Sequence, residues 1–351
     1  MRSRDDIARP RNDDTRPRSD DARPRNDATR PRVGLLLGDP SGIGPEVAAR
    51  LLAQPDVHDL ADIVVLGELH VLEAGAKIAN VSIDPRVYAN LMPLGLVAPG
   101  PIDSGKPSAA YGRAVLAGLR HAADMVARGD IHGAMFAPLN KAAMRMGGLE
   151  HEDELRMLQD HLHFAGYVSE FNITGDLWTS RVTSHLPLRE VAHQITTAGV
   201  CNAIQVIHTA QRQAGIEAPR IAVAGLNPHA GDNGTMGREE VDIIAPAIAQ
   251  MRARGVDARG PFPADTLFIA ARRGDYDAVV SMYHDQGQIA MKLMGFDSGV
   301  TVLGGLPIPI ATPAHGTAYD IVGRGIASAN ATRQAFNIVT RMAIHRMKET
   351  Q

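Results

Sequence analysis

The chain has 351 residues, 44% of them hydrophobic, and a formal net charge of −3 at pH 7. It is long enough for two domains that share a cleft, or for one large α/β unit. The single cysteine, Cys201, excludes an intramolecular disulfide framework and favours a reducing compartment. There is no secretory h-region, and no apolar run approaches the roughly 20 residues that span a bilayer. We therefore expect a globular, cytoplasmic protein that does not enter the membrane.

The first 32 residues differ from the rest of the chain. Arg-Pro-Arg recurs at 9–11, 16–18, 23–25 and 30–32, and almost no apolar side chain separates the repeats. Because such a segment cannot bury a core and its prolines block helix propagation, we predict a disordered tail over residues 1–32. Its ten Arg and seven Asp give +3 and leave −6 for the remainder. The interleaved acids argue against nucleic-acid binding.

From Val33 on, short apolar runs alternate with segments of helical periodicity. The runs at 33–38, 61–67, 133–138, 220–226, 277–282 and 299–304 are typical of buried parallel strands. The segments at 44–54, 109–129, 239–255 and 331–349 have the apolar spacing of amphipathic helices. Strands that alternate with helices predict a doubly wound α/β sandwich.

A glycine-rich turn lies between the first predicted strand and the first helix. It reads Gly-Asp-Pro-Ser-Gly-Ile-Gly-Pro-Glu at 38–46. Glycines allow close approach of the backbone, and Pro45 suits the first turn of a helix whose N-terminus attracts anions. The spacing is not that of the GxGxxG dinucleotide fingerprint.

Three histidines occur in turn-like or strand-end contexts: His185 in TSHLPL, His229 in GLNPHAG and His284 in SMYHDQG. The last two follow apolar runs, and residues that follow parallel strands gather at the carboxyl edge of a sheet, where open α/β folds bind ligands. Three imidazoles bind a first-row divalent metal and leave a coordination position open for substrate. The spacing matches no short metal motif, so each histidine alone also fits an ordinary surface or core role. A segment of small residues at 314–325 could likewise wrap an adenosine or simply form a tight loop.

Seven segments together resemble one enzyme family, the 4-hydroxythreonine-4-phosphate dehydrogenase (PdxA) family of vitamin B6 biosynthesis and its paralogues. These segments are GDPSGIGPE (38–46), APLNK (137–141), TSHLPL (183–188), GLNPHAG (225–231), GPFPADTLF (260–268), MYHDQG (282–287) and HGTAYDIVGRG (315–325). The first and last also resemble the wider isocitrate and isopropylmalate dehydrogenase group, which holds NAD on an HGSAPDI-type loop.

The resemblance implies an α/β fold with two α/β/α sandwich domains and a cleft between them. Domain 1 would comprise 33–147 plus 317–351, and domain 2 would comprise 148–316. The implied reaction is an NAD-dependent, divalent-metal-dependent oxidation of a secondary alcohol followed by decarboxylation. A homodimer would share the active site, with a small-molecule substrate and neither nucleic acid nor membrane as partner.

The resemblance also assigns residues. His185, His229 and His284 match the metal ligands, and His315, Gly316, Thr317 and Ala318 match the loop beside the cofactor, which is NAD with NADP left open. The metal itself is left open among Zn, Co, Ni, Mn, Fe and Mg. Lys292 and Lys141 match substrate contacts that hold a carboxylate or phosphate. Asp285 and Asp265 are candidates for a base or for a residue that orients a ligand histidine.

Three departures from the family pattern concern the substrate. The family's GHTE segment reads Glu-His-Glu-Asp-Glu at 150–154, which keeps a histidine as His151 among added acids. Thr301 stands where Asn is usual, and Ile310 where a phosphate-binding Arg is usual. Losing a guanidinium removes a bidentate phosphate clamp, so we expect an altered substrate that need not carry a phosphate.

Several functions stay open on the sequence alone. The substrate is 4-phosphohydroxy-L-threonine, another phosphorylated sugar acid, or an unphosphorylated hydroxy acid, aromatic cis-dihydrodiol carboxylates included. In a different class, phosphate acyltransferases share this general fold, and a non-catalytic binding protein would keep the cleft. Both of these predict that the three histidines need not converge.

Overall fold

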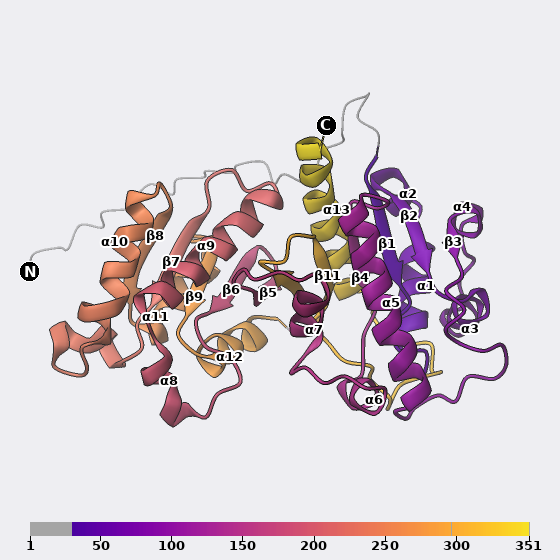
Figure 1. Cartoon of the computed structure of the whole chain (residues 1–351), viewed down its shortest axis with the longest axis horizontal. Coiled ribbons are helices and arrows are strands. Elements are labelled where there is room, and N and C mark those ends of the chain that lie inside the picture. Colours follow the sequence, from indigo (N-terminus) through magenta and orange to yellow (C-terminus); the bar gives the residue numbers. More distant parts are fainter. Residues whose placement is uncertain (1–29, 296, 351) are drawn as a thin grey trace, which may run out of the picture. The chain divides into compact units, whose positions relative to one another are not determined.

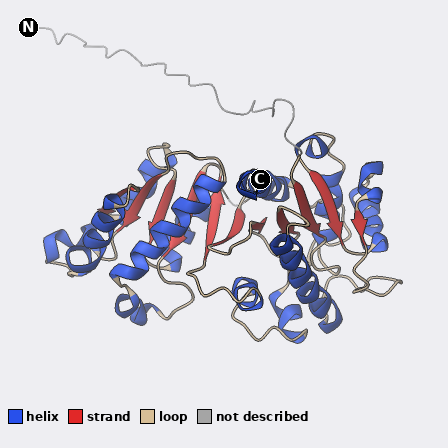
Figure 2. Cartoon of the chain, turned by 45° about the horizontal axis from the view of Figure 1, so that its top comes forward, coloured by secondary structure: helices blue, strands red, loops and turns tan. Residues whose placement is uncertain are grey.

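One mixed sheet carries the strands of the computed structural model, which describes residues 30–295 and 297–350. The order among the described residues is β3-β2-β1-β4-β11-β10-β5-β6-β9-β7-β8 (Figures 1 and 2). The strands are β1 (Arg32–Leu36), β2 (Asp62–Leu66), β3 (Leu91–Met92), β4 (Gly133–Phe136), β5 (Ser169–Thr174), β6 (Leu177–Arg181), β7 (Arg220–Ala224), β8 (Asp257–Phe262), β9 (Ala278–Ser281), β10 (Val300–Gly304) and β11 (Ile310–Pro313). The predicted disordered tail lies outside the described residues up to position 29, and Arg32 already belongs to β1.

The helices of the described residues flank this sheet. They are α1 (Gly44–Leu52), α2 (Val57–Leu60), α3 (Leu69–Ala79), α4 (Pro85–Ala89), α5 (Ala109–Arg128), α6 (Lys141–Met146), α7 (Glu154–His161), α8 (Leu188–Gln194), α9 (Thr197–Gln213), α10 (Ala245–Ala253), α11 (Ala264–Arg272), α12 (His284–Met294) and α13 (Asn330–Thr350). A 3₁₀ segment, η1 (Pro228–Gly234), and a π segment, η2 (Glu240–Ile244), complete the set. None of the described helices combines the length and hydropathy needed to cross a membrane.

Alternate side chains of each strand pack on opposite faces of the sheet, as period-2 geometry requires. In β7, Ile221 and Val223 join a core cluster with α9 and α10, whereas Ala222 and Ala224 join a second cluster with α11. In β1, Val33 and Leu35 pack toward α1 and α3. Helices therefore cover both faces, and the predicted α/β fold class is confirmed.

The six segments predicted as strands all contain strands, and the four predicted helical segments all contain helices. One direction was wrong: β10 is antiparallel to both neighbours, β11 and β5. Burial periodicity reports which side chains face the core and says nothing of strand direction. The central strands β11, β10, β5 and β6 form an antiparallel ladder between two parallel halves of the sheet.

The division into domains 33–147 plus 317–351 and 148–316 stays a prediction. Residues 31–351 form one compact unit by their internal contacts, and the sheet runs through it without a break. All four strands of the antiparallel ladder fall within the predicted domain 2, and in the sheet the predicted boundary lies between β4 and β11.

Candidate active site

The three predicted metal histidines follow three neighbouring parallel strands. His185 comes after β6, His284 after β9 and His229 after β7. Strand β9 pairs in parallel with β6 on one side and with β7 on the other. The histidines therefore leave the sheet at one edge, the carboxyl edge at which open α/β sheets bind ligands.

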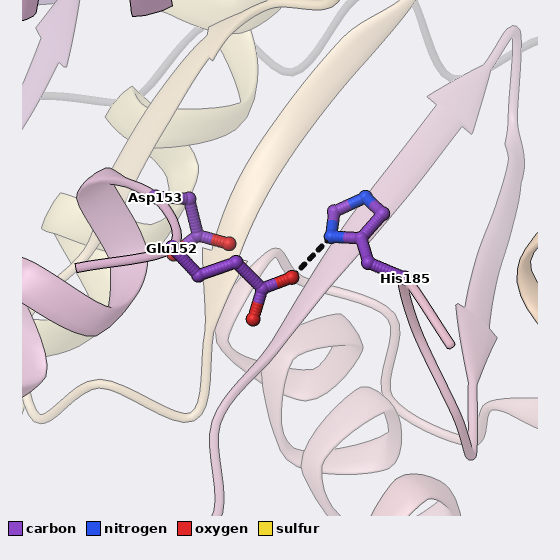
Figure 3. A group of neighbouring side chains, drawn as sticks. All are labelled: Glu152, Asp153 and His185. Carbon is purple, nitrogen blue, oxygen red and sulfur yellow. Dashed lines mark hydrogen bonds and ion pairs between the residues drawn. The ribbon is translucent and has the colours of Figure 1, made fainter. Parts of the chain in front are cut away.

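His185 and His284 lie together. Their ring centroids are 5.4 Å apart, with the ring planes tilted by 45°. Each ring has its Nδ1 atom against a carboxylate: His284 Nδ1 is 2.6 Å from Asp285 Oδ1, and His185 Nδ1 contacts Glu152 Oε1 (Figure 3). The Nε2 atoms remain for another ligand, an arrangement common where histidine binds a metal.

His229 stands on a strained turn. It has φ 54° and ψ 29°, and residues 229–233 all have positive φ. A non-glycine residue costs free energy in this region, so the surroundings must hold the turn in place. Glu240, only 2% exposed, does this: its Oε1 accepts hydrogen bonds from the backbone N–H groups of Leu226 and Asn227, both at 2.7 Å.

The described residues of one chain do not bring all three histidines into one group. The cluster in which three acidic or imidazole ligand atoms lie within 4.8 Å of one another consists of Glu152, Asp153 and His185. The donor chemistry of the His185 and His284 pair fits a divalent metal of the nitrogen-preferring kind, because both rings are oriented by carboxylates. The three-histidine ligand set stays a prediction.

A cavity of about 390 Å³ is lined by His284 and by residues of β5, β10 and the loop after β11. It gathers side chains that the sequence placed in different motifs: Lys141, Lys292, Thr301, His315 and Gly316 all line it. The two lysines are exposed and so are free to meet an anionic group of a ligand.

A hydrogen-bond network on β5 and β6 forms one wall of this cavity, and sequence reasoning missed it. Asn172 Oδ1 accepts from Arg181 Nη1 at 3.1 Å and from Gln288 Nε2, and Asn172 Nδ2 donates to Thr301 Oγ1 at 3.3 Å. Arg181 also pairs with Glu170, with 2.8 Å between Nη2 and Oε2. Neither strand was predicted, because the strand predictions relied on continuous apolar runs, whereas β5 alternates polar and apolar residues and β6 carries the polar run Thr-Ser-Arg.

Glu154 contributes an unusual carboxyl group to the same cavity. Burial raises its pKa above its ordinary value, the nearby Glu170 raises it further, and Lys141 opposes the shift. The ion pair of Glu170 with the buried Arg181 has no net charge. This wall therefore combines hydrogen-bond donors and acceptors with an ion pair and a carboxyl group of raised pKa.

The predicted cofactor loop lies against the glycine-rich turn at 38–46. The Thr317 carbonyl accepts from Ile43 N at 3.0 Å, and Thr317 Oγ1 accepts from Asn140 Nδ2 at 3.3 Å. Gly42 permits this approach, since a Cβ there would lie 2.7 Å from Thr317 Cβ. His315 and Gly316 face the cavity, whereas Thr317 is buried and Ala318 has φ 43°.

Three other residues singled out by the sequence lie away from the cavity lining. His151 Nε2 is 3.6 Å from Asp160 Oδ2, and Asp265 is exposed in the first turn of α11. Ile310 is 2% exposed and packs in the core cluster beneath α5 and α7. The isoleucine at 310 is thus a core residue, and the structure gives it no contact with the cavity.

Comparison with known proteins finds a matching family and several similar proteins. Residues 59–339 match the family described as pyridoxal phosphate biosynthetic protein PdxA. A Pseudomonas aeruginosa protein is 48% identical over 330 residues, covering 90% of this chain and 98% of its own length. Its name is "Putative 4-hydroxythreonine-4-phosphate dehydrogenase 2".

Two solved structures carry the comparison further. The 4-hydroxythreonine-4-phosphate dehydrogenase of Klebsiella pneumoniae superposes with a TM-score of 0.77 at 32% identity, covering 91% of this chain and 99% of that one. A terephthalate 1,2-cis-dihydrodiol dehydrogenase of Burkholderia xenovorans has a TM-score of 0.66 at 26% identity and covers 89% of this chain and 98% of its own.

Proposed function

This chain belongs to the PdxA family of pyridoxal phosphate biosynthetic proteins, and we propose on that premise that it catalyses the NAD-dependent oxidative decarboxylation of a hydroxy acid. Relatives named as 4-hydroxythreonine-4-phosphate dehydrogenases support the dehydrogenase class. The observation that carries the proposal is the pairing of His185 with His284, which lines a cavity together with two lysines and with His315 and Gly316 of the predicted cofactor loop.

His185, His229 and His284 would hold the divalent metal, His229 being supplied by the second subunit of a homodimer. A bound cation acts as a Lewis acid toward an alcohol or ketone oxygen and so favours both oxidation and loss of CO₂. Asp285 holds His284 through its Nδ1 atom, which supports a role as an orienting residue over one as a base.

The remaining residues position the two reactants. Lys292 and Lys141 would bind the substrate carboxylate, since both are exposed cations on the cavity lining. His315 and Gly316 would lie beside the nicotinamide, with Thr317 fixing their loop on the turn at 38–46. Asp265 and His151, which lie off the lining, would take no direct part.

We further infer that the substrate is a polyhydroxylated or amino hydroxy acid, with no phosphate required. Asn172, Thr301, Gln288 and Glu154 form a wall of donors and acceptors that suits hydroxyl or amine groups. Ile310 does not contribute to this inference, because it is buried in the core.

The reducing compartment expected from the buried free thiol of Cys201 is the cytoplasm.

The test is NADH formation by metal-loaded protein with three substrate sets: 4-phosphohydroxy-L-threonine, unphosphorylated polyhydroxy and amino hydroxy acids, and aromatic cis-dihydrodiol carboxylates. His284→Ala is the inactive control, and His345→Ala is the matched control on α13, away from the cavity. We expect turnover in the second set. Turnover confined to the phosphorylated compound would contradict the substrate class, and no turnover in any set would favour the acyltransferase or binding-protein alternatives.

A further inference from the structure

Glu152 lies in the segment between α6 and α7, directly before the residue that caps α7. Asp153 is that cap: it is 5% exposed, and its Oδ1 accepts a hydrogen bond from Arg156 N at 2.8 Å. A buried side-chain cap fixes the backbone at the start of a helix. The backbone next to Glu152 is therefore held in place, although its own side chain is half exposed.

From this position the Glu152 side chain reaches the histidine loop after β6. Its Oε1 contacts His185 Nδ1, a contact between residues 33 positions apart (Figure 3). Its neighbour in the sequence, His151, turns instead toward Asp160. Within the 150–154 segment it is thus Glu152 that is joined to a predicted metal ligand.

The contact determines which nitrogen of the imidazole carries the proton. A neutral imidazole has one N–H donor and one lone-pair acceptor. A carboxylate against Nδ1 requires the proton to be on Nδ1, which leaves the Nε2 lone pair available to a cation. Asp285 makes the same contact with His284 Nδ1 at 2.6 Å. Each of the two neighbouring rings therefore has a carboxylate against its Nδ1 atom, and the two carboxylates come from different segments.

We propose that Glu152 is a positioning residue that fixes the tautomer and orientation of His185, so that His185 and His284 present matched Nε2 atoms to the same cation. This inference rests on the proposed function. It adds a residue from the segment that precedes α7 to a site otherwise built from loops that follow β6, β7 and β9. Partners of this kind typically change metal affinity by about 10- to 100-fold when they are removed.

The first measurement is the histidine tautomer in the metal-free protein. Long-range ¹H–¹⁵N spectra of protein labelled with ¹⁵N-histidine are compared for wild type, Glu152→Ala and Glu152→Gln, with His185→Ala to assign the signal. We expect the Nδ1–H form of His185 in wild type, its loss in Glu152→Ala, and partial retention in Glu152→Gln, because an amide oxygen still accepts. Glu190→Gln is the matched control, since Glu190 is equally exposed and lies in the segment after His185.

The second measurement is Co²⁺ affinity, read from visible absorption on titration. Glu152→Ala should bind Co²⁺ about 10- to 100-fold more weakly than wild type, with Glu190→Gln unchanged. An unchanged tautomer and affinity in Glu152→Ala would overturn the inference. Failure of the wild type to bind Co²⁺ would overturn the proposed function instead, and the metal-free spectra would still decide whether Glu152 sets the tautomer. Far-UV circular dichroism confirms that each variant is folded.

Discussion

The phenol of Tyr319 donates a hydrogen bond to Asp39 Oδ2 at 3.0 Å, across 280 positions of the sequence. Asp39 is 1% exposed, and its other oxygen accepts from the Ser41 backbone N–H and hydroxyl at 2.9 and 2.6 Å. The glycine-rich turn after β1 and the predicted cofactor loop after β11 are thus one hydrogen-bonded unit. Burial raises the pKa of Tyr319, which keeps the phenol protonated as the donor.

Tyr319→Phe should loosen this unit. Loss of a hydrogen bond to a buried carboxylate costs about 2 kcal/mol, and the remaining bonds from Ser41 limit the damage. We expect a lower free energy of unfolding in urea and a higher KM for NAD with kcat less affected. Tyr88→Phe, on the exposed α4, is the control. An unchanged KM for NAD would show that this hydrogen-bonded unit does not affect cofactor binding.

Arg181→Leu should strongly lower the free energy of unfolding, because Arg181 holds the cavity wall together. The guanidinium is buried and bonds Glu170, Asn172 and Ser184, so its removal leaves the partly buried Glu170 carboxylate without its cation. Breaking a buried ion pair by removing one partner costs about 3 kcal/mol or more. The double variant Arg181→Leu with Glu170→Gln should recover part of this loss in urea unfolding, because no unpaired charge remains. Equal stability of the single and double variants would contradict the explanation that the unpaired Glu170 carboxylate causes the loss.

Glu154→Gln should change how stability depends on pH. Because burial raises the pKa of Glu154 in the folded protein, the folded state holds this proton to higher pH than the unfolded state does. The contribution of Glu154 to stability is therefore present below the unfolded pKa and declines as pH rises through the folded pKa. The variant should be more stable than wild type at neutral pH and similar in acid, as measured by thermal melts across pH. Glu73→Gln is the control: Glu73 is exposed on α3, so this variant should show the same pH dependence of stability as wild type.

The sequence was most informative where motifs follow apolar runs. His229 and His284 were placed at a sheet edge because the runs before them are buried strands, and β7 and β9 confirm that placement. Strand β6, which carries His185 to the same edge, was not recognised, since its polar residues Thr179, Ser180 and Arg181 are buried by pairing rather than by apolar character.

Contacts between distant segments were out of reach of sequence reasoning. Glu152 and His185 are far apart in the chain, and nothing in their local pattern predicts that they meet. The same holds for Asn172, whose amide joins β5, β6, β10 and α12. Ile310, at the position where the family resemblance puts a phosphate-binding Arg, packs in the core cluster beneath α5, and the loss of a phosphate ligand there stays a prediction.

His229→Gly and His229→Ala should separate a ligand role from backbone strain. Both remove the imidazole, but glycine adopts φ 54° readily and alanine does not. We expect His229→Gly to be about 1 kcal/mol more stable than His229→Ala in urea unfolding. Both should lose Co²⁺ affinity equally. Wild-type affinity in either variant would contradict the assignment of His229 as a ligand.

Subunit complementation tests whether the active site is shared. His185 and His284 lie together within one chain, with ring centroids 5.4 Å apart, whereas His229 joins no such group in the described residues. If His229 reaches the pair from the second subunit, a mixed dimer of His229→Ala and His185→Ala chains contains one intact set of three histidines. Mixing these two inactive proteins, after mild dissociation and reassociation, should restore up to half of the activity per mixed dimer. Mixing His185→Ala with His284→Ala should restore none, because each pair then lacks one member, and activity in that mixture would contradict the proposed arrangement.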